Sequence, residues 1–253
     1  MRRISRLTYS LLTASALHLA ACGGDAADQA SFASATQAQR ERAIVAGTGA
    51  DSMIATLIAS SAAAVPPGTP SCPKVETSDN TVTVSGGCTT SDGEKVSGRF
   101  TGTNLPPLFG AGSGYDPTKP TEVSFDGYLL DSAGTEDDLA IDGTVTMHPD
   151  ERVIVDLRVS LGGLEAISRG TWKSAGESTT VEAGTTIEVT GVGEAEVQGT
   201  WNMDGDFSSG ALELHGADVL KVDIAAMVDG CAPITIDGKA AGQICNDSDD
   251  DVE

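Results

Sequence analysis

A strand pattern centred on glycine recurs along the chain, and it constrains the fold more than any other feature. The clearest copies are Ile141-Asp142-Gly143-Thr144-Val145, Ser168-Arg169-Gly170-Thr171-Trp172 and Val197-Gln198-Gly199-Thr200-Trp201, with looser ones at Ser97–Phe100 and Phe125–Tyr128. Glycine inside a strand marks a bend, a bulge or a close backbone approach. The Thr, Val and Trp residues beside it favour a pleated, half-buried surface. The repetition therefore predicts a mainly β protein, a curved antiparallel β-meander of about ten strands.

Residues 70–245 carry this β pattern, and residues 38–66 carry a helical one. Arg152–Leu161 is the clearest strand, because its apolar residues alternate with polar ones and only Ile154 breaks the order. Sheets that alternate in this way have one apolar face, which needs a cover. In the helical segment, Ile54, Leu57, Ile58 and Ala62 fall on one stripe, and Asp51 is a suitable N-cap. We therefore expect the helical segment to pack on the apolar face of the sheet.

The first 21 residues read as a signal peptide. Three arginines precede a short apolar run, Leu7–Ala21, and the run ends in Leu19-Ala20-Ala21-Cys22. This ending resembles the lipobox of bacterial lipoproteins. The resemblance implies cleavage before Cys22, acylation of Cys22, and a palmitate-type membrane anchor that needs no spanning helix. Because Gly23 and not aspartate follows the cysteine, we expect the outer membrane, with the domain facing the periplasm or the cell surface. Residues 22–37 are predicted to be a flexible tether.

The chain is strongly acidic, and this excludes some partners. The formal net charge is −22, and it falls to −25 when the signal peptide with its three arginines is removed. Nucleic acid and anionic lipid would repel such a chain, so neither is expected as a direct partner. Residues 246–253 form an acidic segment that is predicted to be a disordered tail.

Four cysteines remain after Cys22, and an exported protein meets an oxidising compartment, so two disulfides are expected. The midpoint of Cys72 and Cys88 falls in the turn Ser78–Asn80. The midpoint of Cys231 and Cys245 falls at Asp237–Lys239. Each pair would therefore face across its own hairpin, which favours Cys72–Cys88 and Cys231–Cys245.

A second resemblance covers about the first 100 residues. Cys72-Pro73, Asn80-Thr81-Val82-Thr83-Val84, Gly87-Cys88-Thr89, Asp92-Gly93 and Ser97-Gly98 resemble the opening hairpin of uncharacterised all-β lipoproteins of Gram-negative bacteria. Those proteins share the lipobox and the Ala/Ser-rich helix that precede it here. The resemblance implies an extracytoplasmic β-meander and carries no assigned activity.

Groups for catalysis or metal binding are scarce. His148 and His215 have no metal-ligand spacing to another His or Cys and are interpreted as surface residues. Gly-x-Trp, a lipocalin signature, occurs twice, but both copies lie in the middle of the meander, so we interpret the tryptophans as packing residues. The one calcium candidate is a loop with oxygen ligands at alternate positions, Asn202, Asp204, Asp206, Ser208 and Glu213. A hairpin loop is preferred there, because Phe207 stands where a calcium loop requires glycine.

These observations predict a non-enzymatic, lipid-anchored extracytoplasmic protein without cofactors, in a structural or protein-binding role. The alternative is a carrier that holds a lipid or another apolar ligand in the curved sheet. A lesser alternative is a hydrolase that uses a pair of carboxylates, which the sequence cannot locate.

Overall fold

A computed structural model of the protein describes residues 29–63, 72–91, 93–106, 114–131, 138–176, 178–204 and 207–245. The predicted signal peptide, Cys22, and the acidic segment 246–253 lie outside the described residues. Within them, no single helix is long and apolar enough to cross a bilayer; Gln37–Gly47 and Ala50–Ala62 pass that test only as a pair bent by 67°.

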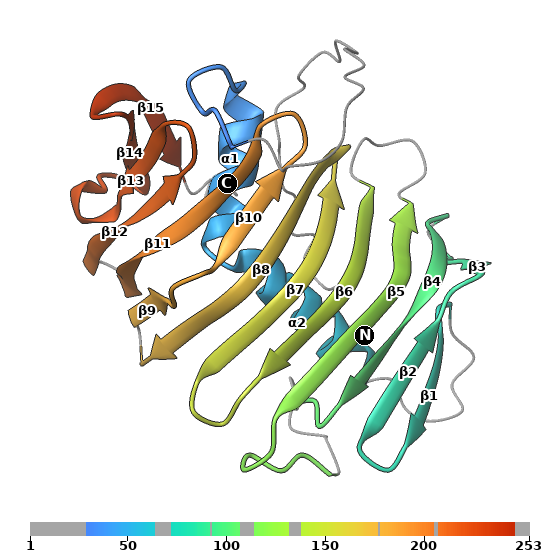
Figure 1. The fold of residues 1–253 in the computed structure, drawn as a ribbon. Helices are drawn as coiled ribbons and strands as arrows, with labels where there is room; N and C mark the ends of the chain where they lie inside the picture. Colours follow the sequence, from blue (N-terminus) through green and yellow to red (C-terminus); the bar gives the residue numbers. More distant parts are fainter. Residues whose placement is uncertain are drawn as a thin grey trace, which may run out of the picture.

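The protein is mainly β, and one antiparallel sheet holds all fifteen strands (Figure 1). This confirms the predicted fold class, although the strands outnumber the ten expected. The helices are α1 (Gln37–Gly47) and α2 (Ala50–Ala63), with a short 3-10 helix, η1 (Ile224–Ala226). The strands are β1 (Lys74–Ser78), β2 (Thr81–Ser85), β3 (Cys88–Thr89), β4 (Lys95–Thr103), β5 (Thr121–Asp131), β6 (Leu139–Met147), β7 (Arg152–Leu161), β8 (Leu164–Ala175), β9 (Ser178–Val181), β10 (Thr186–Val189), β11 (Gly193–Asp204), β12 (Phe207–His215), β13 (Val219–Asp223), β14 (Cys231–Ile236) and β15 (Lys239–Cys245).

The sheet is a meander in which neighbours in sequence are neighbours in space. Its order runs from β1 to β15, with β3 beside β4 and with β9 and β10 both between β8 and β11. In β7, Val155, Leu157 and Val159 are buried, while Ile154 is exposed as its place in the alternation predicts. The buried residues of the strands and helices form one apolar core between the sheet and the helices.

The glycine of the repeated pattern has a visible role in β8. β9 pairs with Trp172–Ala175 of β8, and β10 pairs with Ala166–Arg169. Between β9 and β10 the chain passes over Gly170, whose φ of +140° disfavours other residues. A Cβ at Gly170 would lie 2.6 Å from the Cα of Thr185, and the hydroxyl of Thr185 accepts the Thr171 N–H at 3.0 Å. Gly170 therefore leaves room for the buried Thr185 at the point where the strand beside β8 changes from β9 to β10.

The two helices lie on one face of the sheet (Figure 1). α1 contacts β8, β10 and β12, and α2 crosses strands from β7 to β1. α1 begins with a capping box in which Thr36 and Gln39 exchange hydrogen bonds between side chain and backbone. It ends where the indole of Trp172 donates to the Gly47 carbonyl at 2.9 Å. This hydrogen bond satisfies one of the carbonyls that a helix end leaves without a partner.

A buried ion pair fixes the corner between the helices. The Arg42 guanidinium contacts both carboxylate oxygens of Asp51 at 2.8 and 3.1 Å and also donates to the Val159 carbonyl of β7 at 2.9 Å. Asp51 was expected to be an N-cap, but α2 begins one residue earlier and the carboxylate binds Arg42 instead. Burial raises the pKa of Asp51, and Arg42 opposes this shift by stabilising the carboxylate.

The second half of the predicted tether is packed against the domain. The N–H of Ala30 donates to the Glu194 carbonyl at 2.7 Å, and Phe32 is fully buried. The Asp218 carboxylate accepts the N–H groups of Phe32 and Ala33 at 2.7 and 2.9 Å. The prediction of a flexible tether is therefore wrong for residues 29–36. Their composition of small and polar residues suggested a tether, but the single buried Phe32 packs the segment against the domain.

Candidate functional site

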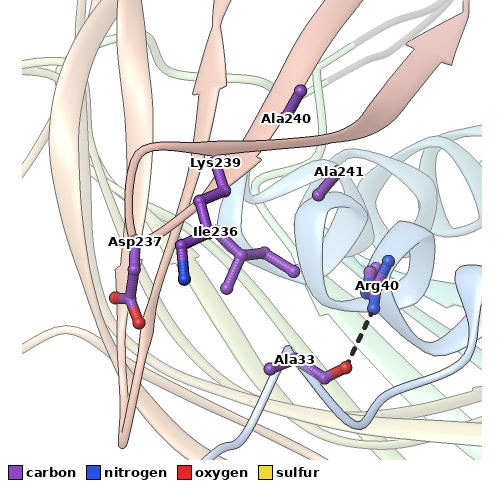
Figure 2. Close-up of a pocket in the computed structure, with 7 residues that line it drawn as sticks. All are labelled: Ala33, Arg40, Ile236, Asp237, Lys239, Ala240 and Ala241. Atoms are coloured by element: carbon purple, nitrogen blue, oxygen red, sulfur yellow. Dashed lines mark hydrogen bonds between the residues drawn. The ribbon is translucent and has the colours of Figure 1, made fainter.

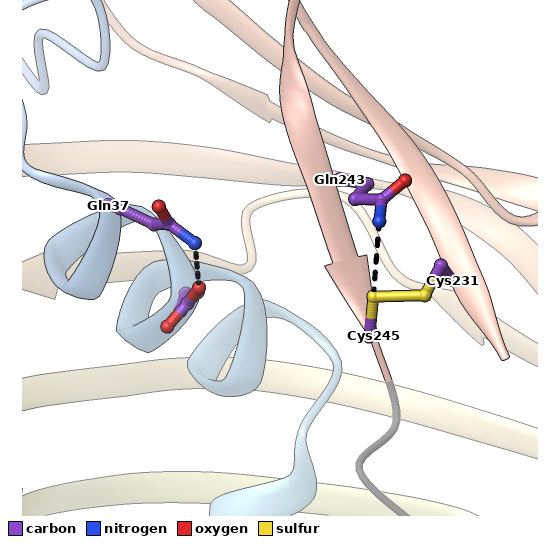
Figure 3. Close-up of a disulfide and its surroundings, with 5 residues drawn as sticks. Gln37, Cys231, Gln243 and Cys245 are labelled. Carbon is purple, nitrogen blue, oxygen red and sulfur yellow. Dashed lines mark hydrogen bonds between the residues drawn. A yellow bond between two sulfur atoms is a disulfide. The ribbon is translucent and has the colours of Figure 1, made fainter. Parts of the chain in front are cut away.

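Both predicted disulfides form with the predicted pairing. Cys72 and Cys88 lie 5.8 Å apart at their Cα atoms and close the open end of the β1–β2 hairpin. Cys231 and Cys245 are directly opposite each other in the β14–β15 ladder (Figure 3). The two bridges therefore hold the first and last hairpins of the sheet.

The calcium candidate does not assemble in the described residues. Asn202 pairs with Ser209, whereas Glu213 lies four residues further along β12, opposite Gln198. At about 3.4 Å per residue this places Glu213 about 14 Å from Ser209, too far to share one ion. The Glu213 carboxylate instead contacts His215 at 3.1 Å and Lys221 at 3.3 Å. The side chains of residues 203–208 lie outside the described part of the structure.

The two histidines are separate from each other and half-buried. His148 lies between β6 and β7, and His215 ends β12 beside Glu213. Both side chains keep partial exposure, 32% for His215, as residues at the surface of the domain do. In the part of the chain that the structure describes, no three His, Cys, Asp or Glu residues are grouped so as to hold a metal ion.

The strongest candidate for a binding site is an apolar groove between α2 and the first strands of the sheet. Its cavity measures about 380 Å³. One wall comes from α2 and the other from β1, β2, β4 and β5, and the lining residues are Leu57, Ile58, Ser61, Ala62, Cys72, Pro73, Val75, Val84, Phe100 and Tyr128. The groove is therefore an apolar hollow beside the first disulfide.

Aromatic packing makes the sheet side of the groove rigid. The rings of Phe100 and Tyr128 lie 5.1 Å apart edge to face, and Phe125 lies 5.2 Å from Phe100. Burial raises the pKa of the Tyr128 phenol to about 12, with a smaller contribution from the negative charge of Glu94. The phenol therefore stays neutral well above pH 7, as a mainly apolar hollow requires.

The orientation of α2 leaves large apolar side chains in solvent. Ala55 and Ala59 are fully buried against the sheet, whereas Leu57 is 49% exposed and Met53 is 66% exposed. The expected stripe is therefore only partly correct: Ile58 and Ala62 pack against the core, but Leu57 is exposed and the fully buried positions are Ala55 and Ala59. Small residues let the helix approach the sheet closely, and Met53 and Leu57, one turn apart, are turned outward.

The sequence pattern gave no direct signal for this groove, because no local pattern fixes how α2 lies against the strands that follow it in the chain. The one available signal was that α2 is apolar around much of its circumference. A helix of this composition is expected either to be buried on all sides or to present a contact surface.

Comparisons with protein-family models, with curated proteins and with solved structures found no match for this chain.

Proposed function

We propose that this protein is a lipid-anchored extracytoplasmic protein that binds a protein partner through the groove and the outward face of α2. The observation that carries the proposal is the exposure of Met53 and Leu57 beside an apolar hollow. Contiguous exposed apolar residues are uncommon on monomeric proteins and mark contact sites. A helix whose apolar side chains stand beside a groove is suited to a partner segment with apolar anchors.

The packing of the sheet favours a protein-binding role, and it argues against a carrier that holds a ligand on the open face of the sheet. α1 and α2 cover the apolar face, and their alanines are buried against it, so that face is filled by the chain itself. A sheet that carried a large ligand would need that volume to be open.

A hydrolase has little support among the described residues. The buried carboxylates there are Asp51 and Asp218. Asp51 is held by Arg42, and Asp218 by backbone N–H groups of the N-terminal segment. Both carboxylates are thus engaged in contacts that hold the fold together, whereas glycoside hydrolysis needs a pair of carboxylates free to act on a substrate.

The carrier remains the second candidate, because the groove itself is lined by apolar and aromatic side chains. Its volume of about 380 Å³ lies at the lower end of the range for small-ligand sites. A hollow of this size would hold part of one acyl chain or a compact apolar ligand.

Lipidation of Cys22 would keep the domain close to the bilayer. Among the described residues, Gln29 is the first that contacts the sheet, and seven residue steps separate it from Cys22. A fully extended chain of this length spans about 23 Å. The proposed membrane partner therefore includes only the acyl chains, with the domain at the outer-membrane surface, in the periplasm or outside the cell.

Site-specific photocrosslinking in the native host tests the interaction. A photoreactive phenylalanine at position 57 is expected to capture a defined protein, and Met53→Glu should abolish the adduct. Position 154 is the matched control, because Ile154 is also a large exposed apolar residue, 41% exposed, on a strand of the sheet. Equal capture from both positions would contradict a specific partner. Stoichiometric lipid released from the purified protein, and displaced by Leu57→Trp, would favour the carrier.

The anchor is tested separately. Cys22→Ser should leave the precursor without incorporated palmitate, and normal incorporation in that variant would contradict the proposed lipidation.

A further inference from the structure

A second pocket lies between the N-terminal segment and the β14–β15 hairpin (Figure 2). Its volume is about 310 Å³, and its lining includes Arg40 of α1, Ile236 of β14 and Lys239 of β15. In Figure 2, Arg40 and Lys239 lie on opposite sides of Ile236. The pocket therefore has an apolar floor between two cationic side chains.

These two cations differ from almost all others in the protein. Of the fifteen Lys and Arg residues, twelve lie in the described part of the chain. Nine of the twelve have a carboxylate oxygen within 4.0 Å. Within the described residues, Arg40, Lys173 and Lys239 do not, and two of these three line the same pocket. The pocket thus holds two cations without a carboxylate oxygen within 4.0 Å among the described residues, together with one acid, Asp237.

The polar groups around the pocket leave this charge available. The Nε–H and one terminal N–H of Arg40 donate to the Phe32 and Ala33 carbonyls at 2.8 and 3.3 Å, so other guanidinium N–H groups remain. Asp237, the one acid in the lining, accepts the Val219 N–H at 3.1 Å through one carboxylate oxygen. Glu41, the next residue on α1, accepts a hydrogen bond from Gln37 at 2.8 Å.

The acidic end of the chain begins on the same hairpin. Residues 246–253 read Asn-Asp-Ser-Asp-Asp-Asp-Val-Glu, with five carboxylates in eight residues. They follow Cys245, which the disulfide fixes at the end of β15, and Lys239 begins that strand. Six residue steps, about 20 Å, separate Cys245 from Lys239, and eight extended residues span about 26 Å. β15 is the last strand in the sheet order, so no described strand occupies its outer edge.

We propose that residues 247–253 fold back along β15 and bind in this pocket, with their carboxylates against Lys239 and Arg40. Charge and reach together support this occupant. Lys173 is the other described cation without a carboxylate partner that the acidic segment could contact. It lies opposite Arg152 in the ladder of β7 and β8, far along the sheet from β15. An elongated segment with several acids suits two cations on either side of an apolar floor better than a single small anion does.

Zero-length crosslinking of the full chain in detergent tests the proposal. A carbodiimide activates a carboxylate, the Lys amine displaces the urea product, and the resulting amide has lost one water. Peptide mapping is expected to find Lys239 joined to residues 247–253, with little product at Lys173. The yield should fall strongly in 1 M NaCl, where the screening length is about 3 Å.

Variants and isotope labelling decide what the crosslink means. Asp249→Asn, Asp250→Asn and Asp251→Asn together leave the described fold untouched and should reduce the Lys239 product severalfold. Arg40→Gln should reduce it about two- to fivefold, the range for one exposed charge pair. A mixture of ¹⁴N- and ¹⁵N-labelled protein should give products from one molecule only. Equal yields at Lys239 and Lys173, or products that join two molecules, would overturn the proposal.

Discussion

Replacing Gly143 by alanine tests whether the glycines of the repeated strand pattern are required by the sheet. Gly143 lies in β6 opposite Leu157 of β7, with φ at +110°. A Cβ there would overlap the carbonyl oxygen of Asp156 and would lie 3.2 Å from the Cα of Leu157. Both neighbours are backbone atoms of a hydrogen-bonded strand, so neither can move aside without disturbing the ladder.

The expected cost has two parts. An L-residue in a sparsely populated backbone region costs about 1–3 kcal/mol. Overpacking against fixed neighbours costs about 1–3 kcal/mol more. Gly143→Ala is therefore expected to lower the free energy of unfolding by about 2–6 kcal/mol. Strand propensity alone predicts the opposite sign, because alanine loses less backbone entropy than glycine.

Gly163→Ala is the matched control, because Gly163 also has a positive φ, +77°, but a Cβ there would meet nothing within 4 Å. It should cost only the backbone strain, about 1–2 kcal/mol. Urea unfolding followed by circular dichroism measures both variants. Equal midpoints for the two would mean that close backbone approach does not require Gly143, and a rise at Gly143 would refute the reasoning as a whole.

Three further predictions concern the helix corner, the groove and the last hairpin. Arg42→Met or Asp51→Asn alone should lower stability by about 3–5 kcal/mol, because each leaves a buried group unpaired, and combining Arg42→Met with Asp51→Leu should recover part of this loss in urea melts. The pKa of Tyr128 is raised to about 12 in the fold from 10.0, so stability should fall as the pH rises through 10 towards 12. Tyr128→Phe should lose less stability between pH 10 and 12, because it has no phenol to ionise. Identical curves of stability against pH for the two proteins would contradict a raised pKa of Tyr128. Replacing Cys231 and Cys245 by serine should lower stability by about 3 kcal/mol on the chain-entropy model, since the bridge spans 14 residues. An unchanged urea midpoint would mean that the disulfide does not restrict the unfolded chain.

The sequence alone was sufficient for features that depend on residues close together in the chain. Alternation in Arg152–Leu161 predicts a strand and its buried face, because the side-chain period of a strand is fixed by its backbone. The cysteine spacings predict both disulfides for a similar reason, since residues equidistant from a tight turn face each other across a hairpin. The curved antiparallel meander follows from repeating such local units.

Tertiary structure decided the features that depend on which surfaces meet. α2 could bury either its large or its small residues, and the sheet selected Ala55 and Ala59 because they allow closer approach, which left Leu57 exposed. The segment before α1 is polar by composition, yet Phe32 and the distant Asp218 attach it to the domain. The cationic pocket joins Ala33 and Arg40 to residues 236–241 at the far end of the sheet order, and local pattern carries no information about such a contact.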